Sequence, residues 1–147
     1  MEQPINYNEE FKDAIKRLSF SDAKYKKLSQ MFSQIHKNAL LESFSDNHFF
    51  YPKYVFTNPE HAELYFIERE KVLLCKATDN EYIFNLVHLG NEYELSYIVR
   101  NDYDSNSLII KKAGKEILSL DSVKDTNISW RSKYYNLIAF INIELSK

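Results

Sequence analysis

Residues 62–100, AELYFIEREKVLLCKATDNEYIFNLVHLGNEYELSYIVR, decide the fold. This stretch divides into runs rich in β-branched and aromatic residues, separated by short polar joints. The runs are Glu63–Arg69, Val72–Ala77, Glu81–Leu89 and Glu92–Arg100. The last run begins with strict alternation of polar and apolar side chains, which is the period of a strand with one buried face. Consecutive strands joined by short turns predict an antiparallel meander.

The joints between the runs have turn chemistry. Asp79-Asn80 favours a turn, and Gly90-Asn91 predicts a two-residue hairpin, because glycine adopts the positive φ that a type II′ turn needs. Ser107–Lys111 and Glu116–Leu120 give two more strands around a tight turn at Gly114. We therefore expect a sheet of six to seven antiparallel strands.

The segment that follows the sheet fits two periods. With period two, Tyr135, Leu137, Ala139, Ile141, Ile143 and Leu145 alternate with polar residues as in a strand. As a helix, it places one set of residues within an arc of about 100°, the width of a core-facing stripe. That set is Trp130, Tyr134, Leu137, Ile138, Ile141 and Leu145. An uninterrupted pattern of about 17 residues is too long for an ordinary strand, so we expect a helix over residues 127–146.

Residues 1–44 predict a helical hairpin. Asn6 and Glu9 can form a capping box for the first helix, and Ser21 with Asp22 begins the second. The apolar seam of the second helix is Tyr25, Leu28, Phe32, Ile35 and Ala39. Residues 45–61 are expected to be a linker, with aromatic side chains that dock on the core and a short strand at Tyr54–Phe56. With the sheet at 62–121, the 147 residues are expected to form a single α+β domain.

The end of the chain resembles that of pleckstrin-homology-like barrel domains in small bacterial proteins. The resemblance covers residues 54–147 and rests on the stretch 118–130, LSLDSVKDTNISW, followed by Tyr134, Ile138, Ile141 and Leu145. It implies a sheet curled into a partial barrel with a terminal amphipathic helix at one open end. It also implies a lipid-headgroup site at the first hairpin turn. Here that turn, residues 68–71, has balanced charge, which disfavours binding of a polyanion.

Several classes of site lack their sequence signature. Two glycines in the whole chain argue against a phosphate-binding loop. The single Cys75, within an apolar run, is expected to be a buried, unreactive thiol in a cytoplasmic protein. None of the four histidines, at positions 36, 48, 61 and 88, has metal-ligand spacing. We therefore expect no cofactor, no metal and no enzymatic activity, and neither a signal peptide nor a membrane span.

Charge and surface aromatic residues favour a protein partner. Residues 60–104 carry 10 acidic and 4 basic side chains, which argues against nucleic-acid binding and suits a basic partner. A predicted flank of the last helix is also apolar, and either the N-terminal helices or a partner must cover it. The candidate partner-binding residues are Glu81, Glu92, Glu94, Tyr93, Tyr97, Tyr135 and Ile143.

The leading hypothesis is a non-catalytic protein-binding module, such as an immunity or inhibitor protein of a bacterium or phage. Its partner is another protein, or a second copy in a homodimer. The first alternative is an adaptor that binds a membrane surface or a lipid, and the second is an enzyme with an unrecognised site.

Overall fold

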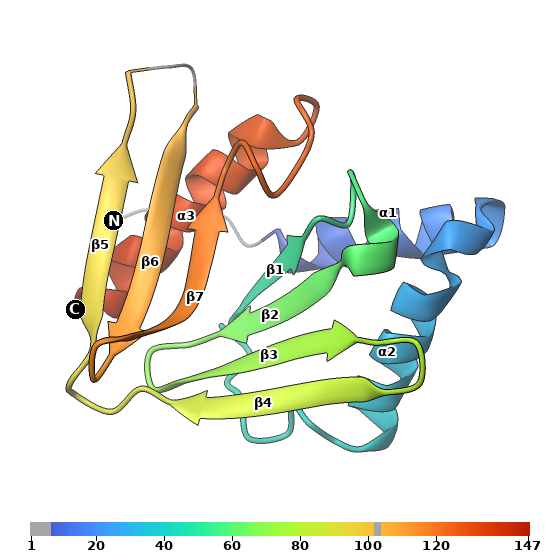
Figure 1. Ribbon diagram of the computed structural model, residues 1–147, viewed down its shortest axis with the longest axis horizontal. Coiled ribbons are helices and arrows are strands. Elements are labelled where there is room, and N and C mark those ends of the chain that lie inside the picture. The colour runs from blue at the N-terminus through green and yellow to red at the C-terminus, as the bar shows by residue number, and fades with distance from the viewer. Residues whose placement is uncertain (1–6, 102–103) are drawn as a thin grey trace.

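The structure is a computed structural model that describes residues 7–101 and 104–147, and it has the expected α+β architecture (Figure 1). The helices are α1 (Asn8–Ser21), α2 (Lys26–Lys37) and α3 (Arg131–Leu145), with short 3-10 turns η1 (Ala23–Tyr25) and η2 (Pro59–His61). The strands are β1 (Phe49–Lys53), β2 (Glu63–Ile67), β3 (Lys71–Ala77), β4 (Tyr82–His88), β5 (Glu94–Val99), β6 (Asn106–Lys112) and β7 (Lys115–Asp121). The predicted capping residue Asn6 lies outside the described residues.

The strands form two antiparallel sheets that do not close into a barrel. One sheet has the order β1-β2-β3-β4 and the other β5-β6-β7. The predicted hairpin at Gly90-Asn91 is wrong, because β4 and β5 do not pair. Leu89 is fully buried, and its N–H donates to the carbonyl of Glu70 at 2.7 Å, which draws the chain into the core after β4. Gly90 then turns the chain, at φ +64°, toward the second sheet.

The turn between β6 and β7 has the expected form. Ala113 and Gly114 both have positive φ, of 53° and 79°, which matches the right-handed twist of a two-residue hairpin. In the strand register, Lys112 of β6 lies opposite Lys115 of β7 at this turn.

The first strand of the larger sheet lies earlier than the sequence predicts. The expected strand at Tyr54–Phe56 is wrong; the chain pairs with β2 over Phe49–Lys53, in the predicted linker. Pro52 is tolerated in β1 because this is an edge strand, so no neighbouring strand needs the missing N–H. As expected, the aromatic run Phe49–Tyr51 of the linker is buried, and Phe50 stacks on Phe66 of β2 with ring centroids 5.0 Å apart.

The outer edge of β1 is closed by a side chain of α1. The Asn8 side chain donates from Nδ2 to the carbonyl of His48 at 2.8 Å and accepts at Oδ1 from the N–H of Phe50 at 2.9 Å. This pair of bonds imitates one step of a neighbouring strand. Further along the edge, the Tyr134 hydroxyl donates to the carbonyl of Pro52.

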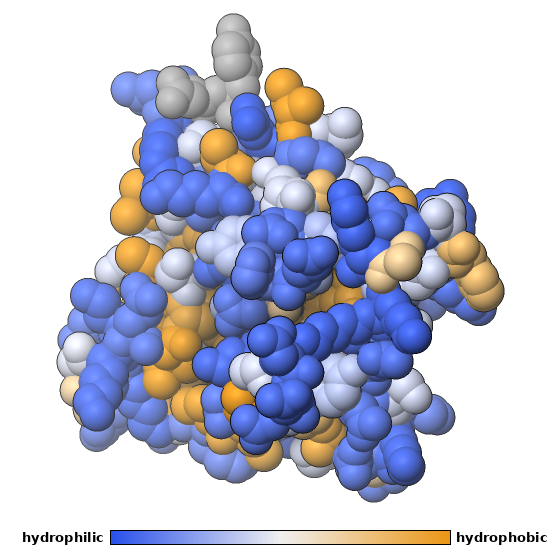
Figure 2. Space-filling model, turned by 45° about the vertical axis from the view of Figure 1, so that its right-hand side comes forward, coloured by the Kyte–Doolittle hydropathy of each residue, from blue (hydrophilic) through white to orange (hydrophobic). Residues whose placement is uncertain are grey.

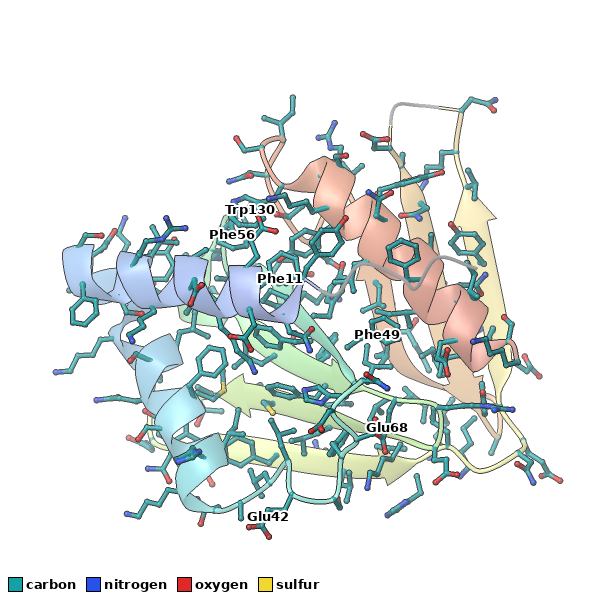
Figure 3. All side chains as sticks on the ribbon, turned by 180° about the vertical axis from the view of Figure 1, so that it is seen from behind. Phe11, Glu42, Phe49, Phe56, Glu68 and Trp130 are labelled. Carbon is teal, nitrogen blue, oxygen red and sulfur yellow. The ribbon has the colours of Figure 1, made fainter. Side chains whose placement is uncertain are left out.

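Helices α1 and α2 lie behind the larger sheet in Figure 1 and share one core with it. Their buried apolar residues are Phe11, Ala14, Ile15, Leu28, Met31 and Ile35. Asp22 begins the second helical segment as expected, since its Oδ1 accepts from the N–H of Lys24 at 3.0 Å. Phe11 reaches the far end of the core, where it points toward Phe56 and Trp130 (Figure 3).

The last segment is a helix, as predicted. Tyr134, Leu137, Ile138, Ile141 and Leu145 are all buried, and α3 packs on one face of the smaller sheet. Asn127 precedes it, and its Oδ1 accepts from the N–H of Trp130 at 3.2 Å.

The expectation that the N-terminal helices cover the second apolar flank of α3 is corrected for Ile143, whereas Tyr135 and Ala139 on the same flank are half-buried. Among the described residues, the side-chain contacts of α1 and of the preceding Tyr7 with α3 lie at the beginning of α3: Lys133 pairs with Glu10, and Asn136 donates to the Tyr7 hydroxyl at 3.3 Å. Because α1 lies across the larger sheet, it points away from the rest of α3. Ile143 therefore remains 54% exposed.

Candidate functional site

The edge of the smaller sheet formed by β5 has no neighbouring strand among the described residues. Near the end of β5 two apolar side chains reach solvent, Ile98 at 43% and Val99 at 56% exposure. Successive strand residues point to opposite faces, so these two present apolar surface on both sides of the edge. Figure 2 shows one face of the molecule, on which apolar residues lie among polar ones.

Two tyrosines join this edge to α3. The Tyr93 hydroxyl donates to the carbonyl of Leu145 at 2.6 Å. The Asn106 amide donates both to the Tyr97 hydroxyl, at 3.0 Å, and to the carbonyl of Tyr135, at 3.1 Å. These bonds place the β5 edge beside α3. We call this region the β5–α3 surface and define it by Glu92, Tyr93, Glu94, Tyr97, Ile98, Val99 and Tyr135. Ile143 is exposed on α3, but no bond among the described residues joins it to this surface.

The structure brings most of the predicted partner-binding residues to this surface. Glu92 and Glu94 are exposed where β5 begins, close to the end of α3 that Tyr93 contacts. Glu81 does not join them. It lies in the turn between β3 and β4, on the other sheet, where its N–H bonds to the Thr78 hydroxyl at 3.1 Å. The exposure of Ile98 and Val99 was not predicted, because apolar residues within a strand pattern are normally expected in the core.

A buried polar cluster joins the two sheets. Asp125, only 1% exposed, accepts at Oδ2 from the Tyr51 hydroxyl at 2.6 Å and from the N–H of Asp121 at 2.7 Å. Its Oδ1 lies 3.7 Å from the Lys53 ammonium, which also donates to the carbonyl of Ser119 at 2.8 Å. Because Tyr51 and Lys53 belong to β1 while Asp121 and Ser119 belong to β7, the cluster holds the facing edges of the two sheets together.

Burial and hydrogen bonding shift the pKa values of the two acids of this cluster, Asp121 and Asp125, in opposite directions. Burial raises the pKa of the Asp125 carboxyl, and the nearby Lys53 ammonium and Tyr51 hydroxyl counter this only in part. Burial also acts to raise the pKa of Asp121, but hydrogen bonds from the N–H groups of Lys124 and Val123 outweigh it and leave that pKa lowered. Every polar contact above is internal, so we assign the cluster a structural role.

The turn between β2 and β3, where the resemblance places a headgroup site, is tied down internally. Arg69 donates to the carbonyl of Lys147 at 2.6 Å, and Lys71 donates to the carbonyl of Ser43 at 2.7 Å. Glu68 accepts from the N–H of Ser45 at 2.9 Å and lies 3.8 Å from the Lys71 ammonium (Figure 3). These charges fasten the linker and the C-terminus to the sheet.

The structure does not gather residues of the described chain into a metal site or a reactive site. Over residues 7–101 and 104–147, no three His, Cys, Asp or Glu side chains are arranged to hold a metal ion. Cys75 is buried as predicted, and burial raises the pKa of its thiol to about 12.

A groove that the sequence analysis did not predict lies between α1 and α2. It consists of two hollows, of about 540 and 430 Å³, that share Lys12 and Phe32. We call it the α1–α2 groove. The sequence feature that could have indicated this groove is the pair Lys12 and Lys16, which are one helical turn apart and lie beside the apolar stripe of α1.

Comparison with known proteins gives one family match. The family model described as "Protein of unknown function (DUF3908)" matches residues 6–136. No curated protein and no solved structure matches the chain. Within the part of the chain that the structure describes, no helix has the length and apolar character needed to cross a membrane.

Proposed function

Because the chain belongs to the DUF3908 family, whose function is unknown, we propose its function from its own surface: it is a non-catalytic protein-binding module. The observation that carries the proposal is the free edge of β5, with Ile98 and Val99 exposed. A free strand edge offers backbone N–H and C=O groups to an incoming extended segment, and apolar side chains beside it add binding energy and specificity.

The partner is a protein with a basic extended segment. Glu92 and Glu94 are exposed at the start of β5, within a stretch, residues 60–104, that has six more acidic than basic side chains. Lys and Arg side chains on the incoming segment complement these carboxylates, and complementary charge raises the association rate and selects the partner. An immunity or inhibitor protein that blocks a basic, nucleic-acid-processing enzyme in the cytoplasm would act in this way.

The other free edge, β4, is the weaker candidate. Its one large exposed apolar residue is Leu86, at 47% exposure. The first residue of that strand, Tyr82, is held against α2 by a hydrogen bond of 2.8 Å to Gln30. The β4 edge therefore supplies a matched control for the β5 edge.

Selection from a phage library of random 12-residue peptides tests the proposal. The wild-type protein is expected to enrich peptides in which apolar residues alternate with Lys or Arg. Val99→Lys is expected to abolish the enrichment, because the added charge blocks the edge and repels the basic segment. Leu86→Lys makes the same change on β4 and is expected to leave the enrichment intact, with far-ultraviolet circular dichroism confirming that both variants fold.

Three results would overturn the proposal. They are equal loss in both variants, enrichment of acidic peptides, and no enrichment by the wild type. A dimer in light scattering that Val99→Lys converts to a monomer would replace the basic partner with a second copy of the chain.

Protein recognition is favoured over the two alternatives. A lipid adaptor of the pleckstrin-homology-like type would use the first hairpin turn, but Arg69 and Lys71 there are engaged in internal hydrogen bonds. An enzyme would need reactive groups gathered at an accessible site. The groups whose pKa values burial raises, Asp125, Tyr51 and Tyr134, are instead enclosed at the junction of the sheets.

A further inference from the structure

The α1–α2 groove runs along the opening between the two N-terminal helices, which form the arms of a V in Figure 3. The hollow near the end of α2 is lined in part by Ile35, Leu41 and Phe66, and the hollow near the end of α1 in part by Ile15 and Phe20. Phe32 belongs to both hollows. The two hollows therefore meet at Phe32, have a largely apolar lining, and are separate from the β5–α3 surface.

One edge of the groove is basic. Lys12 and Lys16 are one turn apart on α1, and neither makes an ion pair with any described residue. His36 lines the groove on α2, and Glu42 is the one acid among the lining residues (Figure 3). The surrounding residues 12–37 carry 7 basic and 2 acidic side chains. The groove thus joins a largely apolar lining to a positive potential, whereas the β5–α3 surface is acidic.

We propose that the α1–α2 groove binds an acidic amphipathic helix of a partner protein. An open groove leaves much of a small ligand in water, but it accepts the apolar face of a helix, with anchor residues spaced three and four apart. Carboxylates flanking that apolar face meet Lys12 and Lys16. This site goes beyond the proposed function, because its ligand has the opposite charge and lies on other elements.

The charges also set the direction of the bound helix. The N-terminus of a helix carries a partial positive charge and its C-terminus a partial negative charge. Glu42 lies at one end of the groove, and Lys16 and Phe20 at the other. The bound helix therefore has its N-terminus beside Glu42 and its C-terminus beside Lys16.

Fluorescence anisotropy with three labelled 18-residue peptides tests the site. The first peptide has Leu on one helical face and Glu beside it, the second has Lys in place of Glu, and the third has the composition of the first in scrambled order. The wild-type protein is expected to bind the first peptide only. The double variant Lys12→Glu/Lys16→Glu is expected to lose about tenfold in affinity for it and to gain affinity for the Lys peptide.

A matched control separates the groove from general charge attraction. Lys24→Glu/Lys26→Glu makes the same charge change on exposed residues that do not line the groove, and it is expected to leave binding unchanged. Val99→Lys is also expected to bind the acidic peptide normally, so that failure of this site and failure of the β5 edge are distinguishable.

Three outcomes would overturn the inference. The first is an equal loss in the Lys24/Lys26 variant, and the second is equal binding of the scrambled peptide. The third is no binding of the acidic peptide by the wild-type protein. If phosphatidylglycerol vesicles then bind and Lys12→Glu/Lys16→Glu abolishes that binding, the groove is assigned to a lipid surface instead.

Discussion

Among the lysines that the structure describes, Lys53 is the one that is buried. Its ammonium is nearly buried beside Asp125, and it also lies 5.8 Å from the centre of the Tyr65 ring. Removing one partner of a buried ion pair leaves the other charge uncompensated, which costs about 3 kcal/mol or more. Lys53→Met is therefore expected to lower the free energy of unfolding by about 3 kcal/mol at pH 8.

The sign of the pH dependence follows from Asp125. A group whose pKa is raised by folding contributes stability below its unfolded pKa, and this contribution is lost as the pH rises through its folded value. The pKa of Asp125 is already raised, and removal of Lys53 raises it further. The destabilisation by Lys53→Met is therefore expected to be smaller at pH 5 than at pH 8 in urea titrations.

Asp121 does not disturb this comparison. Its pKa is lowered by folding, so its stabilisation is lost only as the pH falls below its unfolded value, and it is present in both proteins. Lys53→Met/Asp125→Asn serves as the control and is expected to recover part of the loss. A loss that is independent of pH, or a double variant no more stable than Lys53→Met, would contradict the assigned role of the pair.

Single residues were predictable where their neighbours in sequence determine their environment. Cys75 is buried in an apolar strand, and Tyr134 falls on the buried stripe of its helix, both as expected. The pair Tyr51 and Asp125 was not predictable, because 74 residues separate them. An acid in a polar turn gives no sign that the fold will bury it against another sheet.

At the scale of elements, Asn8 shows how the beginning of a helix protects a strand. The side chain is 6% exposed and bonds to two backbone groups of the β1 edge. Asn8→Ala would leave the buried N–H of Phe50 without its partner, at a cost of about 1–3 kcal/mol. We expect this loss of stability in urea, together with faster hydrogen exchange at the Phe50 amide.

The control for this prediction is Asn85→Ala on the exposed edge strand β4. It is expected to change stability by less than about 0.5 kcal/mol. Unchanged exchange at Phe50 in Asn8→Ala would show that the edge is protected by other contacts.

Elements were predicted well where a periodic pattern was long, and poorly where pairing depends on distant chain. The α3 pattern and the runs of β2 to β7 were found because each holds its period over several residues. β1 was missed because Pro52 argues against a strand, and only the edge position found in the structure makes it acceptable. The break after β4 was missed because Gly90-Asn91 has the composition of a hairpin, while the burial of Leu89 depends on the tertiary fold.

At the scale of the whole molecule, the two proposed surfaces have opposite charge. The α1–α2 groove lies within a segment with five more basic than acidic residues, and the β5 edge within one with six more acidic than basic residues. The summed charge of −2 conceals this division. Composition indicated the acidic segment, but only the structure showed that the basic one lines a groove, because the relevant feature is the angle between α1 and α2.

The order of the strands has a consequence for how the chain reaches its native state. Every strand pair among the described residues joins strands that are consecutive in sequence, so each sheet can form from local hairpins. The contacts between β1 and β7, such as Lys53 with Ser119, span 66 residues. Closing so long a loop is entropically costly, so we expect these contacts to form after the rate-limiting step. In stopped-flow measurements, Lys53→Met should accelerate unfolding and leave the refolding rate nearly unchanged; slower refolding would place the junction in the transition state instead.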